Sequence, residues 1–337
     1  MKPKKDKKII PKDKQPKKKS IIKNDIKKRV KLKIIKTSAP FGFQMADVYV
    51  FPNKNILVNS VYGYKIYNDK YQCIKMKDHV NYSNIKIIDN DNFICLKDNK
   101  KLVNIGLKTG KIKIIYDFKE EISTILYHGD IYITYFIDDN NIKIWKKVSE
   151  NKLQNSLNIS FEEKKYIRIF LIPEKNILVA SVDNENSAAY FIDLKQFKII
   201  SKLEKFFWNM YQLNDNNFIL AWSEDCEYFD YLEIYDFNKN EIVKNIEHKF
   251  WNNCEILVVP KKEIFLVAGF THTGFGCDRE CKEIHVFDSR TYEEIFVLEK
   301  VHYRSILGIR FYEEKNEKES IIITYSEDGA VNFLSLI

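Results

Sequence analysis

The feature that most constrains the fold is a short unit that recurs seven times between residue 41 and the C-terminus. In each unit an apolar run meets a polar turn, a second apolar run follows, and a third run ends in an aromatic or aliphatic residue plus Asp. Successive units are 37 to 57 residues apart, and periods of this size with several strands per unit are typical of propellers or solenoids. The first apolar residues after the polar turns are Ile56, Phe93, Ile131, Ile177, Phe218, Ile264 and Ile321.

The apolar runs have the period of strands and not of helices. Runs such as residues 142–145 and 232–236 alternate polar and apolar positions, and no helical period of 3.6 extends beyond about one turn. The last unit ends at residue 337 after only three runs, while residues 29–35 alternate like a strand. An N-terminal strand could complete that unit and remove an exposed sheet edge. We therefore predict one all-β domain over residues 29–337, a seven-bladed β-propeller whose last blade is closed by the N-terminal strand.

Positive charge is concentrated at the N-terminus. Residues 1–36 contain sixteen Lys and one Arg against three Asp, a net charge of +14, so residues 37–337 carry −6 of the overall +8. Residues 1–28 have no apolar period and too little apolar area to offset chain entropy, so we expect a disordered Lys-rich tail. Such a tail fits a nuclear-import address, contact with RNA or DNA phosphates, or the Lys-rich bias of the whole chain.

Cysteine usage and hydropathy bear on the compartment. The six Cys are scattered and mostly lie within apolar runs, unlike the dense disulfide framework of a small secreted domain. The longest apolar stretches, such as residues 264–270, fall far short of the roughly 20 residues that span a bilayer, and no signal-peptide pattern follows the first Lys residues. We expect a cytoplasmic or nuclear protein without membrane contact, and the oligomeric state stays open.

The last unit carries a recognisable set of polar residues: His302 near its start, Ser326 in its second strand and Asp328 in the following turn. It resembles a blade of the WD-repeat (tryptophan-aspartate repeat) family, in which a His, a Ser or Thr, an Asp and a third-strand Trp form one hydrogen-bond network. Here Phe333 replaces the Trp, and Trp145 is the only Trp in a third strand. The resemblance implies a divergent WD-repeat β-propeller in which His302, Ser326 and Asp328 have structural roles.

Metal binding and catalysis have little support. His272, Cys277, Cys281 and His285 could supply four zinc ligands, but there is no Cys-x2-Cys pair, and His285 lies in an expected strand while the others lie in a long loop. An elaborated hairpin loop with two free thiols is the alternative, and we expect no metal. Nucleophile motifs and Gly-rich phosphate loops are missing, and no carboxylate pair suited to the channel of a propeller enzyme is singled out. We expect no enzymatic activity, no catalytic residue and no cofactor.

The loops that lead from the last strand of one unit into the first strand of the next carry aromatic residues and several of the scarce Arg. Trp, Tyr and Arg are enriched at interface hot spots because they combine a large contact area with a polar group. The sequence thus predicts a non-enzymatic scaffold that binds partner proteins on this face, although packing of the aromatic rings between blades is the alternative. The partner-binding candidates are Tyr166, Arg168, Trp208, Trp251, Tyr303 and Arg304.

Asp288 and Arg290 resemble the Asp-x-Arg box of WD-repeat substrate receptors in cullin-based ubiquitin ligases. That box normally follows Trp or Tyr, whereas here it follows Phe287, and Asp and Arg two residues apart can equally form a local turn salt bridge. Two alternatives to the general scaffold therefore remain: a ligase substrate receptor, and a nucleic-acid-associated protein that acts through residues 1–28.

Overall fold

The computed structural model describes residues 32–37, 45–60, 62–68, 70, 72–136, 141–149, 152–161, 166–183, 187–222, 229–251, 255–269, 282–303, 306–313, 320–327 and 329–336. These residues form seven four-stranded antiparallel sheets and no α-helix. Two single 3-10 turns, η1 (Pro173–Lys175) and η2 (Pro260–Lys262), each connect the first two strands of a sheet. In this described part of the chain, no helix has the length and apolarity needed to cross a membrane.

Six of the sheets, or blades, each take four consecutive strands. Blade 1 consists of β2 (Met45–Val50), β3 (Ile56–Ser60), β4 (Gly63–Tyr67) and β5 (Cys73–Asp78). Blade 2 consists of β6 (Tyr82–Ile87), β7 (Asn92–Lys97), β8 (Lys101–Gly106) and β9 (Ile112–Asp117). Blade 3 consists of β10 (Ile122–His128), β11 (Ile131–Phe136), β12 (Asn141–Ser149) and β13 (Lys152–Ser160). Blade 4 consists of β14 (Ile167–Ile172), β15 (Ile177–Val182), β16 (Ala188–Asp193) and β17 (Lys198–Leu203). Blade 5 consists of β18 (Asn209–Gln212), β19 (Asn217–Trp222), β20 (Phe229–Asp236) and β21 (Glu241–Trp251). Blade 6 consists of β22 (Glu255–Val259), β23 (Ile264–Gly269), β24 (Glu283–Asp288) and β25 (Glu294–Leu298).

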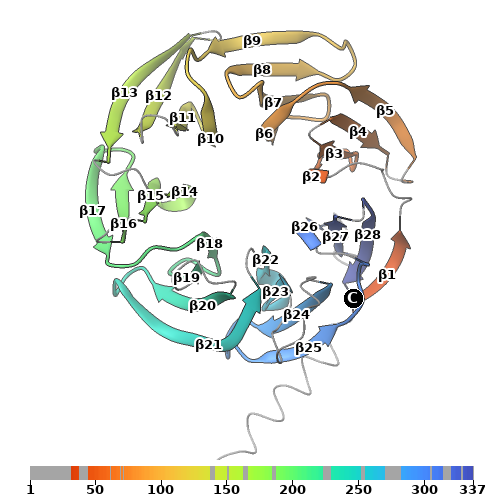
Figure 1. Ribbon diagram of the computed structural model, residues 1–337, viewed down its shortest axis with the longest axis vertical. Helices are drawn as coiled ribbons and strands as arrows, with labels where there is room; N and C mark the ends of the chain where they lie inside the picture. Colours follow the sequence, from red (N-terminus) through yellow and green to blue (C-terminus); the bar gives the residue numbers. More distant parts are fainter. Residues whose placement is uncertain are drawn as a thin grey trace, which may run out of the picture.

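Blade 7 joins the two ends of the chain. Its sheet order is β1-β28-β27-β26, in which β26 (Ile306–Glu313), β27 (Ser320–Ser326) and β28 (Val331–Leu336) come from the C-terminus and β1 (Leu32–Thr37) from the N-terminus. Leu32 pairs with Leu336 and Thr37 with Asn332. Figure 1 shows β1 as the outer strand of this blade and the seven blades arranged in a ring. The predicted seven-bladed β-propeller, closed by the N-terminal strand, is confirmed.

The sequence repeat marks the second strand of every blade. Each of the seven residues at which the repeat was counted is the first or second residue of that strand; Ile56 begins β3, for example, and Phe93 is the second residue of β7. The second strands are the most deeply buried, with all six side chains of β15 inaccessible to water. Strands with both faces covered have continuous apolar runs, which explains why this strand is the easiest to find in the sequence.

The core consists of seven apolar clusters, one at each interface between neighbouring blades. The cluster between blades 7 and 1 packs Val48 and Val58 against Tyr325 and Phe333, so residues from opposite ends of the chain share one core. The other six clusters join consecutive blades in the same way. Removing this apolar surface from water at about 25 cal/mol per Å² supplies the main force that closes the ring.

The Asp that ends each of several third strands caps the turn that follows. Oδ1 of Asp193 accepts hydrogen bonds from the backbone N–H groups two and three residues later, at 2.6 and 2.9 Å. Asp236 and Asp288 make the same pair of bonds. A short carboxylate that binds its own backbone two residues on stabilises a tight turn. The recurring terminal Asp thus has a structural role in three blades.

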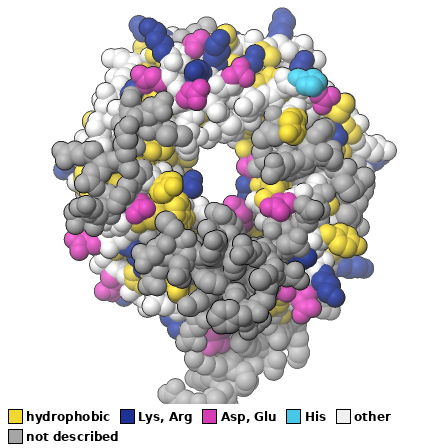
Figure 2. Space-filling model, viewed as in Figure 1, with side chains coloured by type: hydrophobic (Ala, Val, Ile, Leu, Met, Phe, Trp, Pro, Cys, Tyr) yellow, Lys and Arg dark blue, Asp and Glu magenta, His cyan; other side chains and the backbone are white. Residues whose placement is uncertain are grey.

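The first strand of each blade lies nearest the centre of the ring (Figure 1). The space-filling view shows an open channel there (Figure 2). Because strands alternate in direction within a blade, the segments before the first strands and between the second and third strands open onto the same face, which we call the entry face. Of the predicted partner-binding residues, Tyr166, Trp208 and Tyr303 precede first strands and Arg168 is the second residue of one, so the fold places these four on the entry face.

Candidate functional site

Three of the predicted partner-binding residues meet on blades 4 and 5. The ring centroids of Tyr166 and Trp208 are 5.6 Å apart, and the guanidinium carbon of Arg168 lies 5.3 Å from the Trp208 ring centroid. Phe206 packs edge-on against Trp208 with a centroid distance of 4.8 Å. Tyr166 and Arg168 flank the start of β14, and Phe206 and Trp208 immediately precede β18. These four residues are called the entry-face patch below.

The loop that carries Phe206 and Trp208 is held by the residue between them. Phe207 is fully buried in the core between blades 4 and 5, and its backbone N–H donates to the buried Ser181 Oγ at 2.9 Å. Ser181 is also the cross-strand partner of Arg168. The backbone N–H of Trp208 donates to the carbonyl of Ala221 at 2.8 Å. The patch therefore stands on a fixed backbone, and little of its geometry has to be ordered on binding.

A second group of side chains extends the patch on blade 5. Nζ of Lys205 lies 2.6 Å from Oε2 of Glu233 and 3.5 Å from the centroid of the Trp222 ring. Trp222 in turn stacks on Tyr231 with a centroid distance of 4.9 Å. The Glu233 side chain is only 8% exposed, so its charge is neutralised inside the protein by Lys205.

Exposure distinguishes the entry face from the outer rim. Among the described residues, the large exposed aromatic side chains are Tyr62, Tyr166 and Tyr303, at 59%, 60% and 89%, and all three precede a first strand or connect a second strand to a third. Most exposed aliphatic side chains instead lie on outer fourth strands, where charged neighbours such as Lys75 and Lys113 discourage edge-to-edge pairing. Exposed aromatic area is therefore concentrated on the entry face.

The remaining partner-binding candidates are not all placed. Tyr303 lies at the entry to blade 7, two blades beyond blade 5 of the entry-face patch. The side chain of Trp251 and the whole of Arg304 lie outside the described residues. The structure adds three residues to the predicted partner-binding set: Phe206, Lys205 and Trp222. In the sequence, the run Phe206-Phe207-Trp208 was a signal for Phe206 alone.

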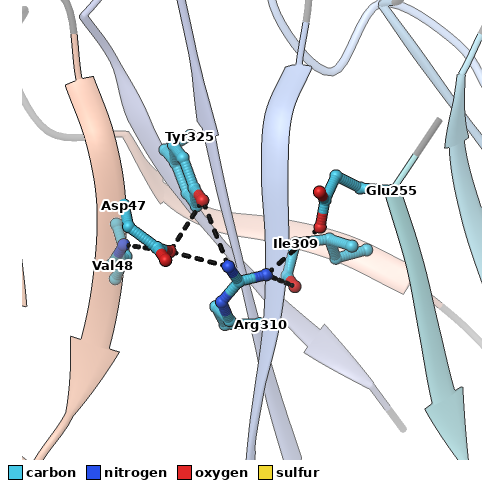
Figure 3. Close-up of polar contacts among 6 residues, drawn as sticks. All are labelled: Asp47, Val48, Glu255, Ile309, Arg310 and Tyr325. Carbon is cyan, nitrogen blue, oxygen red and sulfur yellow. Dashed lines mark hydrogen bonds and ion pairs between the residues drawn. The ribbon is translucent and has the colours of Figure 1, made fainter. Parts of the chain in front are cut away.

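A polar cluster joins blades 6, 7 and 1 (Figure 3). Arg310 on β26 sends one guanidinium nitrogen to Asp47 Oδ1 on β2 at 2.7 Å and the other to Glu255 Oε2 on β22 at 3.3 Å. The hydroxyl of Tyr325 on β27 also donates to Asp47 Oδ1, at 2.8 Å. Arg310 thereby links the first strands of three successive blades across the point where the ring closes.

Burial determines the proton affinities in this cluster. It raises the pKa of Glu255, while the Arg310 guanidinium acts against that rise. Burial, with the adjacent Asp47 carboxylate, also raises the pKa of the Tyr325 hydroxyl well above its usual range, so Tyr325 remains a hydrogen-bond donor. The guanidinium contacts both carboxylates, an arrangement that stabilises the channel wall.

Asp288 and Arg290 form a local structure on the opposite face. Asp288 is buried and caps its turn, while the Arg290 guanidinium lies 3.4 Å from Asp288 Oδ2 and 3.1 Å from Glu263 Oε2. The hydrogen bond to Asp288 raises the pKa of the Arg290 guanidinium above its ordinary value. Asp288 and Arg290 thus form a local turn salt bridge, the arrangement expected as the alternative to a ligase-adaptor box.

Two blades contain hydrogen bonds between residue types that the resemblance to WD repeats led us to expect. In blade 7, His302 Nε2 lies 2.9 Å from Oγ1 of Thr324, two residues before the buried Ser326. In blade 3, Trp145 Nε1 on the third strand donates to Thr134 Oγ1 on the second strand at 2.8 Å. Asp328 lies outside the described residues, so the predicted set of His302, Ser326 and Asp328 stays a prediction.

Of the four candidate zinc ligands, His285 is the one that lies among the described residues. His285 is buried on β24, with Nδ1 2.8 Å from Glu294 Oε2 and Nε2 3.4 Å from Glu283 Oε2. His272, Cys277 and Cys281 lie outside the described residues, as does the Lys-rich segment 1–28. Within the described ranges, no group of three or more His, Cys, Asp or Glu side chains is arranged to hold a metal ion.

No protein-family model matches the chain, and no curated protein sequence matches it. The seven-bladed propeller is thus established by the arrangement of the strands themselves.

Proposed function

We propose that this β-propeller is a non-enzymatic platform that binds partner proteins on its entry face, with Tyr166, Arg168 and Trp208 as anchors. The observation that carries the proposal is the packing of these three side chains, with Phe206, on the entry face. Rigid aromatic side chains and Arg bury much area and lose little rotamer entropy per contact, which is why they dominate binding energies at interfaces.

Internal packing does not account for this cluster. Phe207 fills the core between blades 4 and 5 by itself, whereas Phe206 and Trp208 on either side of it remain partly exposed. Tyr166 is 60% exposed and Arg168 is also exposed. A cluster that keeps this much aromatic surface in water loses hydrophobic stabilisation in the free protein, and burial against a partner would recover it.

The test is partner capture by the full-length chain and by Trp208→Ala and Arg168→Ala variants, with bound proteins identified by mass spectrometry and their affinities then measured with purified components. We expect both variants to weaken binding at least tenfold, a loss of about 1.4 kcal/mol or more. Arg290→Ala on the opposite face is the matched control and should bind normally. If both entry-face variants bind as well as the unmodified chain while folding normally, the proposal is wrong.

We also propose that the chain is a divergent member of the WD-repeat family. The support is the pair of contacts His302–Thr324 and Trp145–Thr134, each of which supplies one half of that family's network in a different blade. Replacing Thr134 with Val should remove the hydrogen bond of Trp145 without changing the shape of the side chain. Because Trp145 is only partly buried, the donor left unpaired should cost about 1 kcal/mol, which denaturant unfolding can measure.

The more specific roles have less support than the general platform. A ligase receptor would use Arg290 to bind the adaptor, but the Arg290 guanidinium already contacts Asp288 and Glu263. If these ion pairs are its only role, Arg290→Ala should leave any binding to a ligase adaptor unchanged. A nucleic-acid role would use residues 1–28, and their deletion should abolish salt-sensitive binding to RNA or DNA if that role is real.

A further inference from the structure

We propose that the entry-face patch selects an acidic segment of its partner, in which an Asp or Glu carboxylate binds Arg168 and a neighbouring apolar side chain packs on Tyr166, Phe206 and Trp208. This inference rests on the proposed function, since it names the chemistry of the partner that the same patch would hold.

The charge of Arg168 is the first support. Its contact with the Trp208 ring is a cation–π contact, and Arg168 forms no ion pair with a carboxylate within the described part of the chain. Other guanidiniums of the structure, those of Arg290 and Arg310, each contact two carboxylates. A guanidinium that stacks on an indole keeps its N–H edge for a planar carboxylate, which it binds with two parallel hydrogen bonds.

Two acidic side chains near the patch, Asp183 and Glu233, already have other partners. Asp183, whose backbone N–H donates to the Tyr166 carbonyl, accepts a hydrogen bond from Ser187 Oγ at 3.0 Å. Glu233 is held by Lys205 at 2.6 Å and is almost completely buried, so this charge is already neutralised. Among the residues that the structure describes, the Arg168 guanidinium thus has no carboxylate partner and lies over the Trp208 ring. Because water is displaced from such a site on binding, a matching carboxylate gains more there than on an open surface.

Arg168 and its place on the Trp208 ring argue against three other occupants. A basic segment, including the chain's own N-terminal tail with its net charge of +14 over residues 1–36, would place like charges together at Arg168. A methylated lysine would need the face of the Trp208 ring that Arg168 already covers. A phosphate group would be better matched by a cluster of cations than by one guanidinium, so we assign the site to a carboxylate.

A random-peptide display library selected on the full-length chain tests the inference directly. We expect the enriched peptides to place Asp or Glu beside an aromatic or aliphatic residue. Synthetic copies should bind about tenfold more weakly to Arg168→Gln, measured by fluorescence polarisation, because one charged contact is lost. Arg168→Glu should reverse the preference, so that Lys- or Arg-containing peptides are enriched instead. Arg290→Glu on the opposite face is the matched control and should leave the enrichment unchanged.

Each outcome of this experiment is informative, provided that the thermal midpoints of the variants match that of the parent chain. If the parent chain and Arg168→Glu enrich the same peptides, the inference is overturned. Selection of neutral or basic peptides by the parent chain would also overturn it. If no peptide binds while protein capture still depends on Trp208, the acidic-segment inference fails and the platform function stands. If capture is also independent of Trp208, both fail.

Discussion

The most direct test of how the ring is held closed is to remove Arg310. Arg310→Met keeps most of the aliphatic stem and deletes the charge that joins Asp47 and Glu255 across three blades. Breaking a fully buried ion pair costs about 3–5 kcal/mol, and an exposed pair contributes about 0–1 kcal/mol. Because these three side chains are between 25% and 34% exposed, we expect an intermediate loss of about 2–3 kcal/mol.

An exposed ion pair with the same shortest N–O distance provides a control. Lys108 and Asp91 are also 2.7 Å apart, but the Lys108 side chain is 79% exposed. Lys108→Met should therefore cost no more than about 1 kcal/mol. Both variants would be unfolded in urea at pH 7, and the free energy of unfolding would be extrapolated linearly to water. Equal losses in the two variants would refute the argument, because burial would then make no difference.

The pH dependence supplies an independent check. The pKa of Glu255 is higher in the folded state than in the unfolded state. Between these two pKa values the folded state holds a proton that the unfolded state has lost, so the free energy of unfolding falls as the pH rises through that range. Arg310 opposes that shift, so its removal raises the folded-state pKa of Glu255 further. The loss in Arg310→Met should therefore shrink when unfolding is repeated at pH 5 or below. A loss that grows on acidification would contradict the assigned role of Glu255.

Three further predictions concern stability. Deleting residues 1–28 should leave the unfolding free energy unchanged within about 0.5 kcal/mol, whereas deleting residues 1–37 removes β1, exposes the edge of β28 and should cause aggregation in light scattering. Phe207→Ala should cost about 3–5 kcal/mol in denaturant unfolding, since this ring is fully buried, and a loss below about 1 kcal/mol would show that the entry loop has another anchor. Gly308→Ala would bring a Cβ into the Tyr325 hydroxyl, so it should destabilise the chain and should do so less in an Arg310→Met background, where the cluster is already broken.

Local rules were enough to predict the blades. The alternating runs and the Asn, Asp and Pro turns identify hairpins because their determinants are adjacent in the chain, and the start of every second strand was predicted within one residue. Ring closure also followed, because counting strands left blade 7 one strand short. Less was predictable at the level of side chains. Of the partner-binding candidates, Tyr166, Arg168 and Trp208 meet, but the sequence offered no reason to prefer these three over Tyr303.

The sequence by itself determined that the chain forms a closed ring of seven four-stranded blades, because turn chemistry and strand alternation act over a few residues. Only the tertiary structure decided which side chains meet between blades. Arg310 and Asp47 are 263 residues apart, and Arg168 reaches Trp208 across the boundary of two blades. Such contacts depend on how wedge-shaped sheets pack around the channel, and this packing is a property of the whole ring. The candidate site lies at those boundaries, so it could not be identified before the ring was assembled.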